Sequence, residues 1–123
     1  MSLDLVQGPI ATTDVFPNSS AAGDPIIMYD TFDKKWVHIE FGQGNSLSLS
    51  RSTTSSPLFT DAGGDWENWN IATQNFPDYP KIGIYKNYYV ISTNEYGDGS
   101  RLPTSYIIQK SDLSPEVNEV ELK

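Results

Sequence analysis

Alternation of apolar and polar residues is the clearest pattern in the first half of the chain. Residues 35–41 and 46–52 each place one kind of side chain on one face and another kind on the other. A period of two is typical of a β-strand whose faces meet different surroundings. With short runs at residues 25–30 and 66–71, the pattern predicts four consecutive strands joined by turns. The serines of residues 46–52 form a row of small hydroxyls, which lets a second layer approach that face closely.

The second half of the chain predicts a similar set of strands. They are expected at residues 81–85, 88–93 and 104–110, followed at 117–122 by a last strand or a frayed tail. Lys86-Asn87 is a two-residue turn of the kind that joins hairpin strands. Residues 94–103 are expected to form a long polar loop. Because no segment has a sustained helical period, we predict an all-β fold.

An internal repeat relates the two halves. The segments that correspond are 24–29 with 79–85, 35–41 with 87–93, and 48–52 with 107–111. Their offset is roughly 55 residues, close to the ~40–50-residue period of four-stranded β-propeller blades. The repeat divides the chain into an N-terminal loop (1–22), a first β unit (23–75) and a second β unit (76–123).

Two such units are an incomplete structure by themselves. Each small sheet has two faces to bury, and propellers close with about four to eight blades. We therefore expect the chain to be a fragment that self-associates through open faces of its β units or by strand swapping. The alternative for this length is a single β-sandwich or barrel, which would be a stable monomer.

Composition narrows the classes of partner. The chain has 16 acidic and 8 basic residues, a formal net charge of −8, and no cysteine. Nucleic acids and anionic membranes require a basic patch, so neither is an expected partner. Disulfides and thiolate chemistry are excluded, and no apolar run reaches the length of a membrane span. The chain contains no signal peptide pattern.

Two stretches resemble known proteins. Residues 23–30 with 35–37, and residues 76–84 with 88–90, resemble consecutive blade starts of predicted β-propeller domains in bacterial secreted proteins. This resemblance covers residues 23–114. It implies a secreted or surface propeller, extracellular or periplasmic in the intact parent, and it implies no particular activity.

Two weaker likenesses are to propellers of other families. Asp61, Gly63 and Trp66 keep the spacing of the Asp-box of sialidase-type propellers, although Phe59 replaces its Ser and Asp65 its Thr. In that family the Asp-box is a structural turn. Separately, Asp24-Pro25 is similar to the blade starts of five-bladed glycoside hydrolases.

Candidate site residues follow from this arrangement. Asp24 and Asp78 precede the first strand of each unit, where the mouth of a propeller channel would lie. Two carboxylates there would suit glycoside hydrolysis or a hard cation; the alternative is that each caps a turn. Tyr29 and Tyr79 are candidate sugar-binding rings, and Glu95 lies in an oxygen-rich segment.

The sequence suggests no cofactor. The segment around Glu95 lacks the Asp spacing of a Ca²⁺ loop, so Ca²⁺ has no specific motif here. His38 is the only histidine, which argues against a zinc site, and we interpret it as structural. We expect a glycan- or protein-binding module with no activity of its own; the alternative is part of a propeller glycoside hydrolase or lyase.

Overall fold

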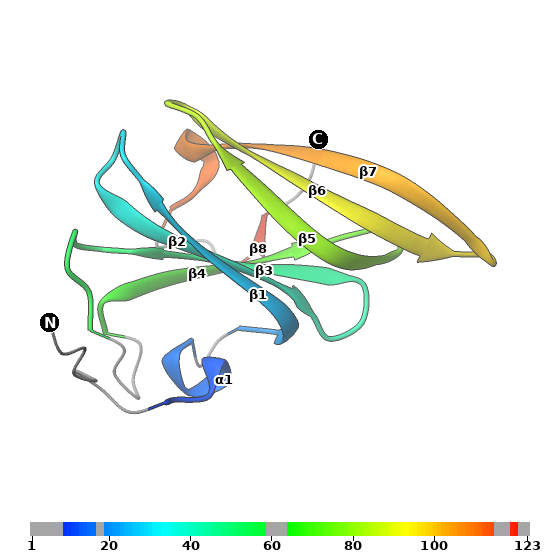
Figure 1. The fold of residues 1–123 in the computed structure, drawn as a ribbon, viewed down its shortest axis with the longest axis horizontal. Helices are drawn as coiled ribbons and strands as arrows, with labels where there is room; N and C mark the ends of the chain where they lie inside the picture. The colour runs from blue at the N-terminus through cyan, green and yellow to red at the C-terminus, as the bar shows by residue number, and fades with distance from the viewer. Residues whose placement is uncertain (1–8, 17–18, 59–63, 115–118, 121–123) are drawn as a thin grey trace, which may run out of the picture.

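The fold is built almost entirely of β-strands, arranged as two sheets (Figure 1). The computed structural model describes residues 9–16, 19–58, 64–114 and 119–120. Its strands are β1 (Ala21–Asp30), β2 (Lys35–Gly42), β3 (Ser46–Ser52), β4 (Trp66–Ala72), β5 (Phe76–Ile84), β6 (Tyr88–Gly97), β7 (Ser100–Gln109) and β8 (Glu119–Val120). Two single-turn helices accompany them, α1 (Thr12–Val15) and η1 (Lys110–Asp112). Within the described ranges, neither helix is long and apolar enough to cross a bilayer. The prediction of an all-β fold is confirmed.

The first sheet has the predicted meander, and the second has one strand fewer than expected. The strand order is β1-β2-β3-β4 in the first sheet, all antiparallel, and β5-β6-β7 in the second. The last strand was expected to complete the second unit, but β8 lies parallel to β4 of the first sheet. The chain turns back at η1, and the Trp69 indole N–H donates to the carbonyl of Ser114 at 2.8 Å. This contact directs the chain after β7 toward the first sheet.

The hairpin of β6 and β7 is longer than the sequence suggested. Residues 94–103 were expected to be a loop, yet the pairing continues without a break to Gly97 opposite Ser100. Asp98 and Gly99 have positive φ, 52° and 74°, as a two-residue type I′ turn requires. The paired residues carry polar side chains on both faces, so the apolar alternation that marks a strand is absent from this part of the hairpin.

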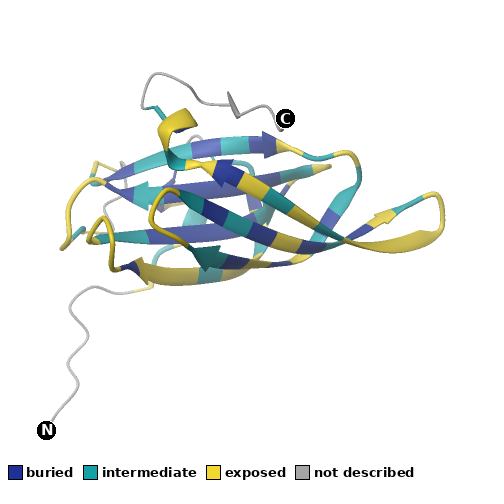
Figure 2. Ribbon diagram, turned by 90° about the horizontal axis from the view of Figure 1, so that it is seen from above, coloured by how far each residue is buried: buried dark blue, intermediate teal, exposed yellow. Residues whose placement is uncertain are grey.

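The two sheets pack face to face over one core. Leu49 and Trp69 from the first sheet meet Tyr89 and Ile91 from the second, and all four are fully buried. The complete buried cluster is Val37, Ile39, Leu47, Leu49, Trp69, Ile71, Ile82, Tyr89, Ile91, Ile108 and Leu113. We call the sides of the sheets that face this core the inner faces, and the opposite sides the outer faces. Figure 2 shows the alternation of buried and exposed positions along the strands.

Both sheets carry a bulge at a comparable place in their first strand. The pairing of β1 with β2 and that of β5 with β6 each shift register there. At each bulge a residue with positive φ precedes a proline: Asp24 (φ 53°) before Pro25, and Tyr79 (φ 55°) before Pro80. A non-glycine residue in this region is uncommon, so the shared feature gives a firm register for comparing the two units.

This register shows that the sheets stack front to back. Aligning the bulges makes Ile26 the counterpart of Lys81, and the strand pairing makes Ile39 the counterpart of Ser92. Ile26 and Ile39 belong to the core between the sheets, whereas Lys81 and Ser92 are exposed on the outer face of the second sheet. Equivalent faces of the two units therefore point in the same direction along the stack.

The outer face of the first sheet is covered by the N-terminal segment, residues 9–16 and 19–20. The Phe16 ring lies 4.8 Å from the His38 ring and 5.2 Å from Trp66, centroid to centroid. Ser20 Oγ makes hydrogen bonds of 3.1 Å with Ser46 Oγ and with Asn70 Oδ1. The expectation that the serine row admits a closely packed second layer is confirmed, because the serines of β3 at positions 48, 50 and 52 are fully buried.

A buried ion pair ties the two units together. Lys110 Nζ lies 2.6 Å from Asp30 Oδ2 and 3.0 Å from Asp33 Oδ2. The carboxylate of Asp30 also accepts the backbone N–H groups of Phe32 and Asp33, at 2.9 and 3.2 Å. Burial acts to raise the pKa of Asp30, but these hydrogen bonds outweigh it and hold the pKa below its ordinary value. We call this group the Asp30–Lys110 clamp.

Candidate functional site

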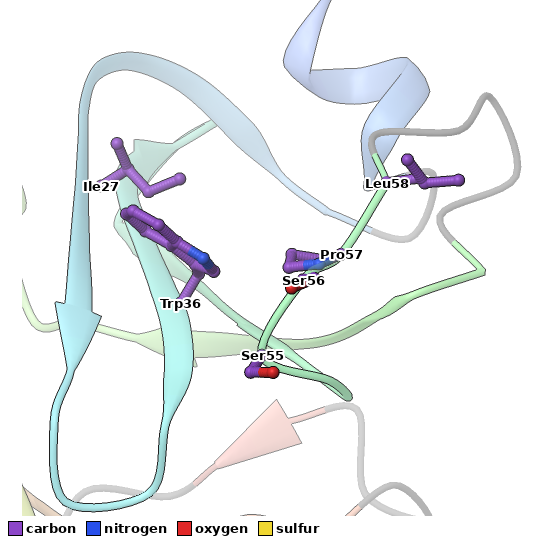
Figure 3. Close-up of a pocket in the computed structure, with 6 residues that line it drawn as sticks. All are labelled: Ile27, Trp36, Ser55, Ser56, Pro57 and Leu58. Carbon is purple, nitrogen blue, oxygen red and sulfur yellow. The ribbon is translucent and has the colours of Figure 1, made fainter. Parts of the chain in front are cut away.

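An open pocket lies beside Trp36 on the first sheet. Its volume is about 480 Å³, and it is lined by Ile27, Trp36, Ser55, Ser56, Pro57 and Leu58. Figure 3 shows Ile27 and Trp36 on neighbouring strands, opposite the segment that follows β3. A volume in this range, with mostly apolar walls and a few polar groups, is typical of small-ligand sites. We call it the Trp36 pocket.

Strand pairing and two sets of hydrogen bonds shape the pocket. Tyr29 pairs with Trp36 in the β1–β2 hairpin. The Trp36 backbone N–H donates to Ser52 Oγ at 2.8 Å, and that hydroxyl donates to the carbonyl of Thr54 at 2.7 Å. These bonds hold the start of the 53–58 loop against β2.

The far end of the same loop is also fixed. The Leu58 backbone N–H donates to Asp65 Oδ2 at 2.7 Å, and the Trp66 indole N–H donates to the Leu58 carbonyl at 3.3 Å. With both ends held, Ser55, Ser56 and Pro57 form a wall opposite the indole. The pocket is therefore formed by the fold itself.

The chemistry of the pocket combines an aromatic ring with hydroxyl groups. Trp36 is half-buried, while Ser55 and Ser56 are exposed on the opposite wall. Tyr29 stands edge-on to Trp36, with centroids 5.1 Å apart and an interplanar angle of 62°. Such rings offer an apolar face, and the Tyr hydroxyl adds a polar group. The arrangement can contact one apolar side of a ligand and hydrogen-bond its edge.

The sequence analysis proposed Tyr29 as a binding residue but did not find this pocket. Tyr29 lies next to the pocket through its contact with Trp36. The signal available was the position of Trp36 on the strand face that does not carry Val37 and Ile39. The other wall comes from an irregular loop, and nothing in its sequence predicts which strand it would lie against.

Asp24 and Asp78 do not occupy equivalent places. By the bulge register, the counterpart of Asp24 is Tyr79, one residue after Asp78. The sequence analysis treated the two carboxylates as equivalent because each precedes the first strand of its unit, although its alignment already matched Asp24-Pro25 with Tyr79-Pro80. Asp24 is exposed and Asp78 half-buried. Neither lines the Trp36 pocket.

Tyr79 lies in a second, smaller hollow on the outer face of the second sheet. This hollow measures about 320 Å³ and includes Lys81, Ser92 and Ser105 among its lining residues. The ammonium of Lys81 lies 3.4 Å from the centroid of the Tyr79 ring, a cation–π contact. The hydroxyls of Ser92 and Ser105 are 3.1 Å apart. The hollow has more polar walls than the Trp36 pocket.

Glu95 is buried rather than part of a solvated loop. It lies on β6 and is 4% exposed. Burial raises its pKa, while hydrogen bonds with the side chain and backbone of Asn75 act in the opposite direction. Its neighbourhood is tight, since a Cβ on Gly97 would overlap the Asn75 side chain. Glu95 therefore lies within a packed region of the second sheet.

His38 and Glu40 form a buried pair under the N-terminal segment. His38 Nε2 lies 3.2 Å from Glu40 Oε1, yet neither atom has a hydrogen-bond partner within the described part of the chain. Burial lowers the pKa of His38 to about 4. Burial also raises the pKa of Glu40, against hydrogen bonds from the Thr12 side chain and the Gly23 backbone. The Phe16 ring packs against the His38 ring, and both His38 and Glu40 are buried, which fits the interpretation of His38 as structural.

The remaining candidates and the comparisons with known proteins add no further site. Phe59, Asp61 and Gly63 of the Asp-box likeness lie outside the described residues. Over the ranges that the structure covers, no group of three or more His, Asp or Glu side chains is arranged to hold a metal ion. No protein family, curated protein or solved structure matches this chain.

Proposed function

We propose that this chain is a carbohydrate-binding module and that the Trp36 pocket is its binding site. The observation that carries the proposal is an indole on one wall and two exposed serines on the other wall of a pocket whose loop segment is held at both ends. The CH groups of a sugar ring would pack on the apolar face of Trp36, and its hydroxyls would exchange hydrogen bonds with Ser55 and Ser56. Such a site needs no catalytic group.

The second part of the proposal concerns architecture. We propose that the two sheets are neighbouring blades of a larger β-propeller. The front-to-back stacking supports this, because blades around a ring meet through opposite faces, whereas the two halves of a twofold sandwich meet through the same face. The shared bulge before Pro25 and Pro80 supports a common origin of the two units.

The binding proposal can be tested on this chain. The protein is titrated with neutral soluble oligosaccharides of α- and β-linked hexoses, and binding is followed by tryptophan fluorescence and isothermal calorimetry. We expect Trp36→Ala to weaken binding by about tenfold or more, because the stacking surface is lost. Leu58→Asp alters the other wall at an exposed position, so it tests the same pocket with little risk to folding.

Tyr79→Ala is the matched control, since Tyr79 is an exposed ring outside the pocket. It should bind like the unmodified chain, and circular dichroism should show that all variants are folded. Binding that survives both Trp36→Ala and Leu58→Asp, or no binding to any oligosaccharide in the panel, would reject the carbohydrate assignment.

One observation favours a second candidate, in which the pocket receives another β unit. By the bulge register, Ile27 is the counterpart of Ile82, which lies in the core between the two sheets. The part of this face around Ile27 that the N-terminal segment leaves exposed would then contact a neighbouring blade in a complete propeller. If this candidate is correct, Trp36→Ala will change the association between chains, and the oligosaccharides will bind neither the unmodified chain nor the variant.

Hydrolysis at Asp24 and Asp78 remains a hypothesis without structural support. A glycosidase needs two carboxylates on opposite sides of one scissile bond. The two residues occupy different positions relative to their bulges, and neither is among the residues that line the Trp36 pocket or the hollow at Tyr79. An Asp24→Asn and Asp78→Asn pair assayed in the intact parent, against the same oligosaccharides, tests it directly.

A further inference from the structure

The outer edge of β7 presents unpaired backbone groups. β7 pairs with β6 along its whole length and stands at the end of the β5-β6-β7 sheet. No other described strand pairs with its second edge. Figure 2 shows the β6–β7 hairpin extending away from the two-sheet stack. An exposed strand edge of this length is a template for another strand.

The hydrogen-bond register identifies which residues face outward. The Lys110 backbone N–H donates to the Asn87 carbonyl at 2.9 Å. At the other end, Gly97 and Ser100 flank the two-residue turn, a place where the closing pair is hydrogen-bonded. Hydrogen-bonded and non-hydrogen-bonded residue pairs alternate along an antiparallel hairpin. The backbone N–H and C=O groups of even-numbered β7 residues therefore point toward β6, and those of odd-numbered residues point toward the free edge. Pro103 fits this assignment, because its missing N–H falls at an outward position.

The two halves of the edge differ in how well they are protected. Arg101 and Pro103 stand at the outer end, and a charge and a proline are devices that discourage strand pairing. From Thr104 to Gln109 such residues are absent, and Ser105, Ile107 and Gln109 direct their N–H groups outward. Ile107 is 65% exposed. The half nearer the core is therefore the half available for pairing.

The first sheet shows what occupies the same edge there. β3 is the counterpart of β7, because each is the third strand of its meander. The edge of β3 away from β2 is paired with β4 over its full length, in antiparallel register. A strand added to β7 would therefore extend a pairing pattern that this fold already uses.

We propose that a second copy of this chain pairs its own β7 with residues 104–109 of β7. A twofold axis makes the two β7 strands antiparallel and gives both partners the same contact. Two three-stranded sheets then become one sheet of six. β7 is suited to this role because the other long edge strands, β1 and β5, lie in contact with each other. The proposal is independent of the Trp36 pocket, which lies on the first sheet.

Ser105→Pro tests the edge without disturbing the hairpin. The Ser105 N–H faces outward, so proline there removes a donor needed by the partner and none used by β6. Analytical ultracentrifugation over a wide range of concentrations should show a dimer for the unmodified chain. We expect Ser105→Pro to weaken dimerisation by about tenfold or more, because each copy loses one intermolecular bond and the edge is sterically blocked.

Two further variants decide between the edge and the outer face. Ser105→Ala removes the hydroxyl but keeps the N–H, so it should dimerise like the unmodified chain. Val90→Lys places a charge on the outer face of the central strand β6 and should also leave the dimer intact. Hydrogen exchange at Ser105 and Ile107 should slow as concentration rises. A monomer at all concentrations, or a dimer lost in Val90→Lys and kept in Ser105→Pro, would overturn edge pairing.

Discussion

At the scale of single residues, the Asp30–Lys110 clamp contains the shortest ion pair among the described residues, at 2.6 Å. The carboxylate of Asp30 is fully buried, so removal of its partner would leave an uncompensated charge in the protein. Breaking a buried pair in this way is costly, although replacing the whole pair by apolar groups often is not. Lys110 also lies 5.0 Å from the centroid of Tyr89, which is part of the core.

We expect Lys110→Met to lower the free energy of unfolding by about 3 kcal/mol. The matched control is Lys81→Met, because Lys81 is exposed and its ammonium lies over a tyrosine ring instead of beside a buried carboxylate; it should change stability little. The pKa of Asp30 is lowered in the folded protein, so its stabilisation is present above the ordinary pKa and is lost as pH falls through the folded value. The difference in free energy of unfolding between Lys110→Met and the unmodified chain, measured by urea unfolding, should therefore become smaller in acid. Equal stability at neutral pH would contradict this account.

His38 predicts a second dependence of stability on pH, which arises from the burial of its imidazole and not from an ion pair. Its pKa is lowered from 6.5 to about 4 because it is buried, so the unfolded chain takes up a proton before the folded one does. Stability is lost as pH falls from 6.5 toward 4, by up to about 3 kcal/mol. As pH falls over this range, the free energy of unfolding of the unmodified protein should fall by this amount relative to that of His38→Gln.

The neighbours of His38 define the control for this experiment. Glu40 on the same strand is the titratable group beside it, and its pKa is raised. Ile27 and Ser50 pair with His38 on the adjacent strands, and Phe16 covers it; none of these titrates. The comparison is therefore repeated in a Glu40→Gln background. A stability gap that is constant with pH in both backgrounds would contradict burial as the cause.

At the scale of elements, β3 joins two layers by having a different chemistry on each face. Its leucines enter the core between the sheets, and its serines meet the N-terminal segment. Asn68 Nδ2 adds bonds to Ser48 Oγ (3.0 Å) and Ser50 Oγ (2.8 Å) across β3 and β4. Small polar side chains are required here because the covering segment lies in direct contact, as the bond between Ser19 and Ser48 shows.

We expect Ser48→Leu to displace the N-terminal segment and to cost about 1–3 kcal/mol, because the larger side chain has no space there. Limited proteolysis should then cleave within residues 9–20 faster than in the unmodified protein. Ser92→Leu is the matched control: a serine at an exposed position on β6. Equal cleavage rates for the two variants would mean that the serine row does not control the docking of this segment.

The strands that could be predicted from sequence are those whose two faces differ. Residues 46–52 alternate between leucine and serine, and the predicted strand agrees with β3 at both ends. The outer part of the β6–β7 hairpin, residues 94–103, was missed because its buried residue Glu95 is polar. Burial that depends on polar groups leaves no apolar period in the sequence. The Trp36 pocket was missed for a related reason, since a loop forms half of it.

At the scale of the whole molecule, one residue of register decides how the two units meet. The sequence alignment matched Ile39 with Ile91, which would bring equivalent faces together. The bulges instead match Ile39 with Ser92 and reverse the face. A shift of one residue moves every side chain of a strand to its other side. The repeat was visible in the sequence, but the stacking direction depended on two bulges that carry no distinctive residue beyond a proline.

The clamp has a consequence for the order of events during folding. Asp30 and Lys110 are separated by 80 residues in the chain, whereas each β-hairpin joins residues that are close in sequence. Closing a long loop costs more conformational entropy than closing a short one, and hairpins form on a microsecond timescale. The clamp should therefore form after both meanders exist. Its loss should increase the unfolding rate and leave the folding rate nearly unchanged.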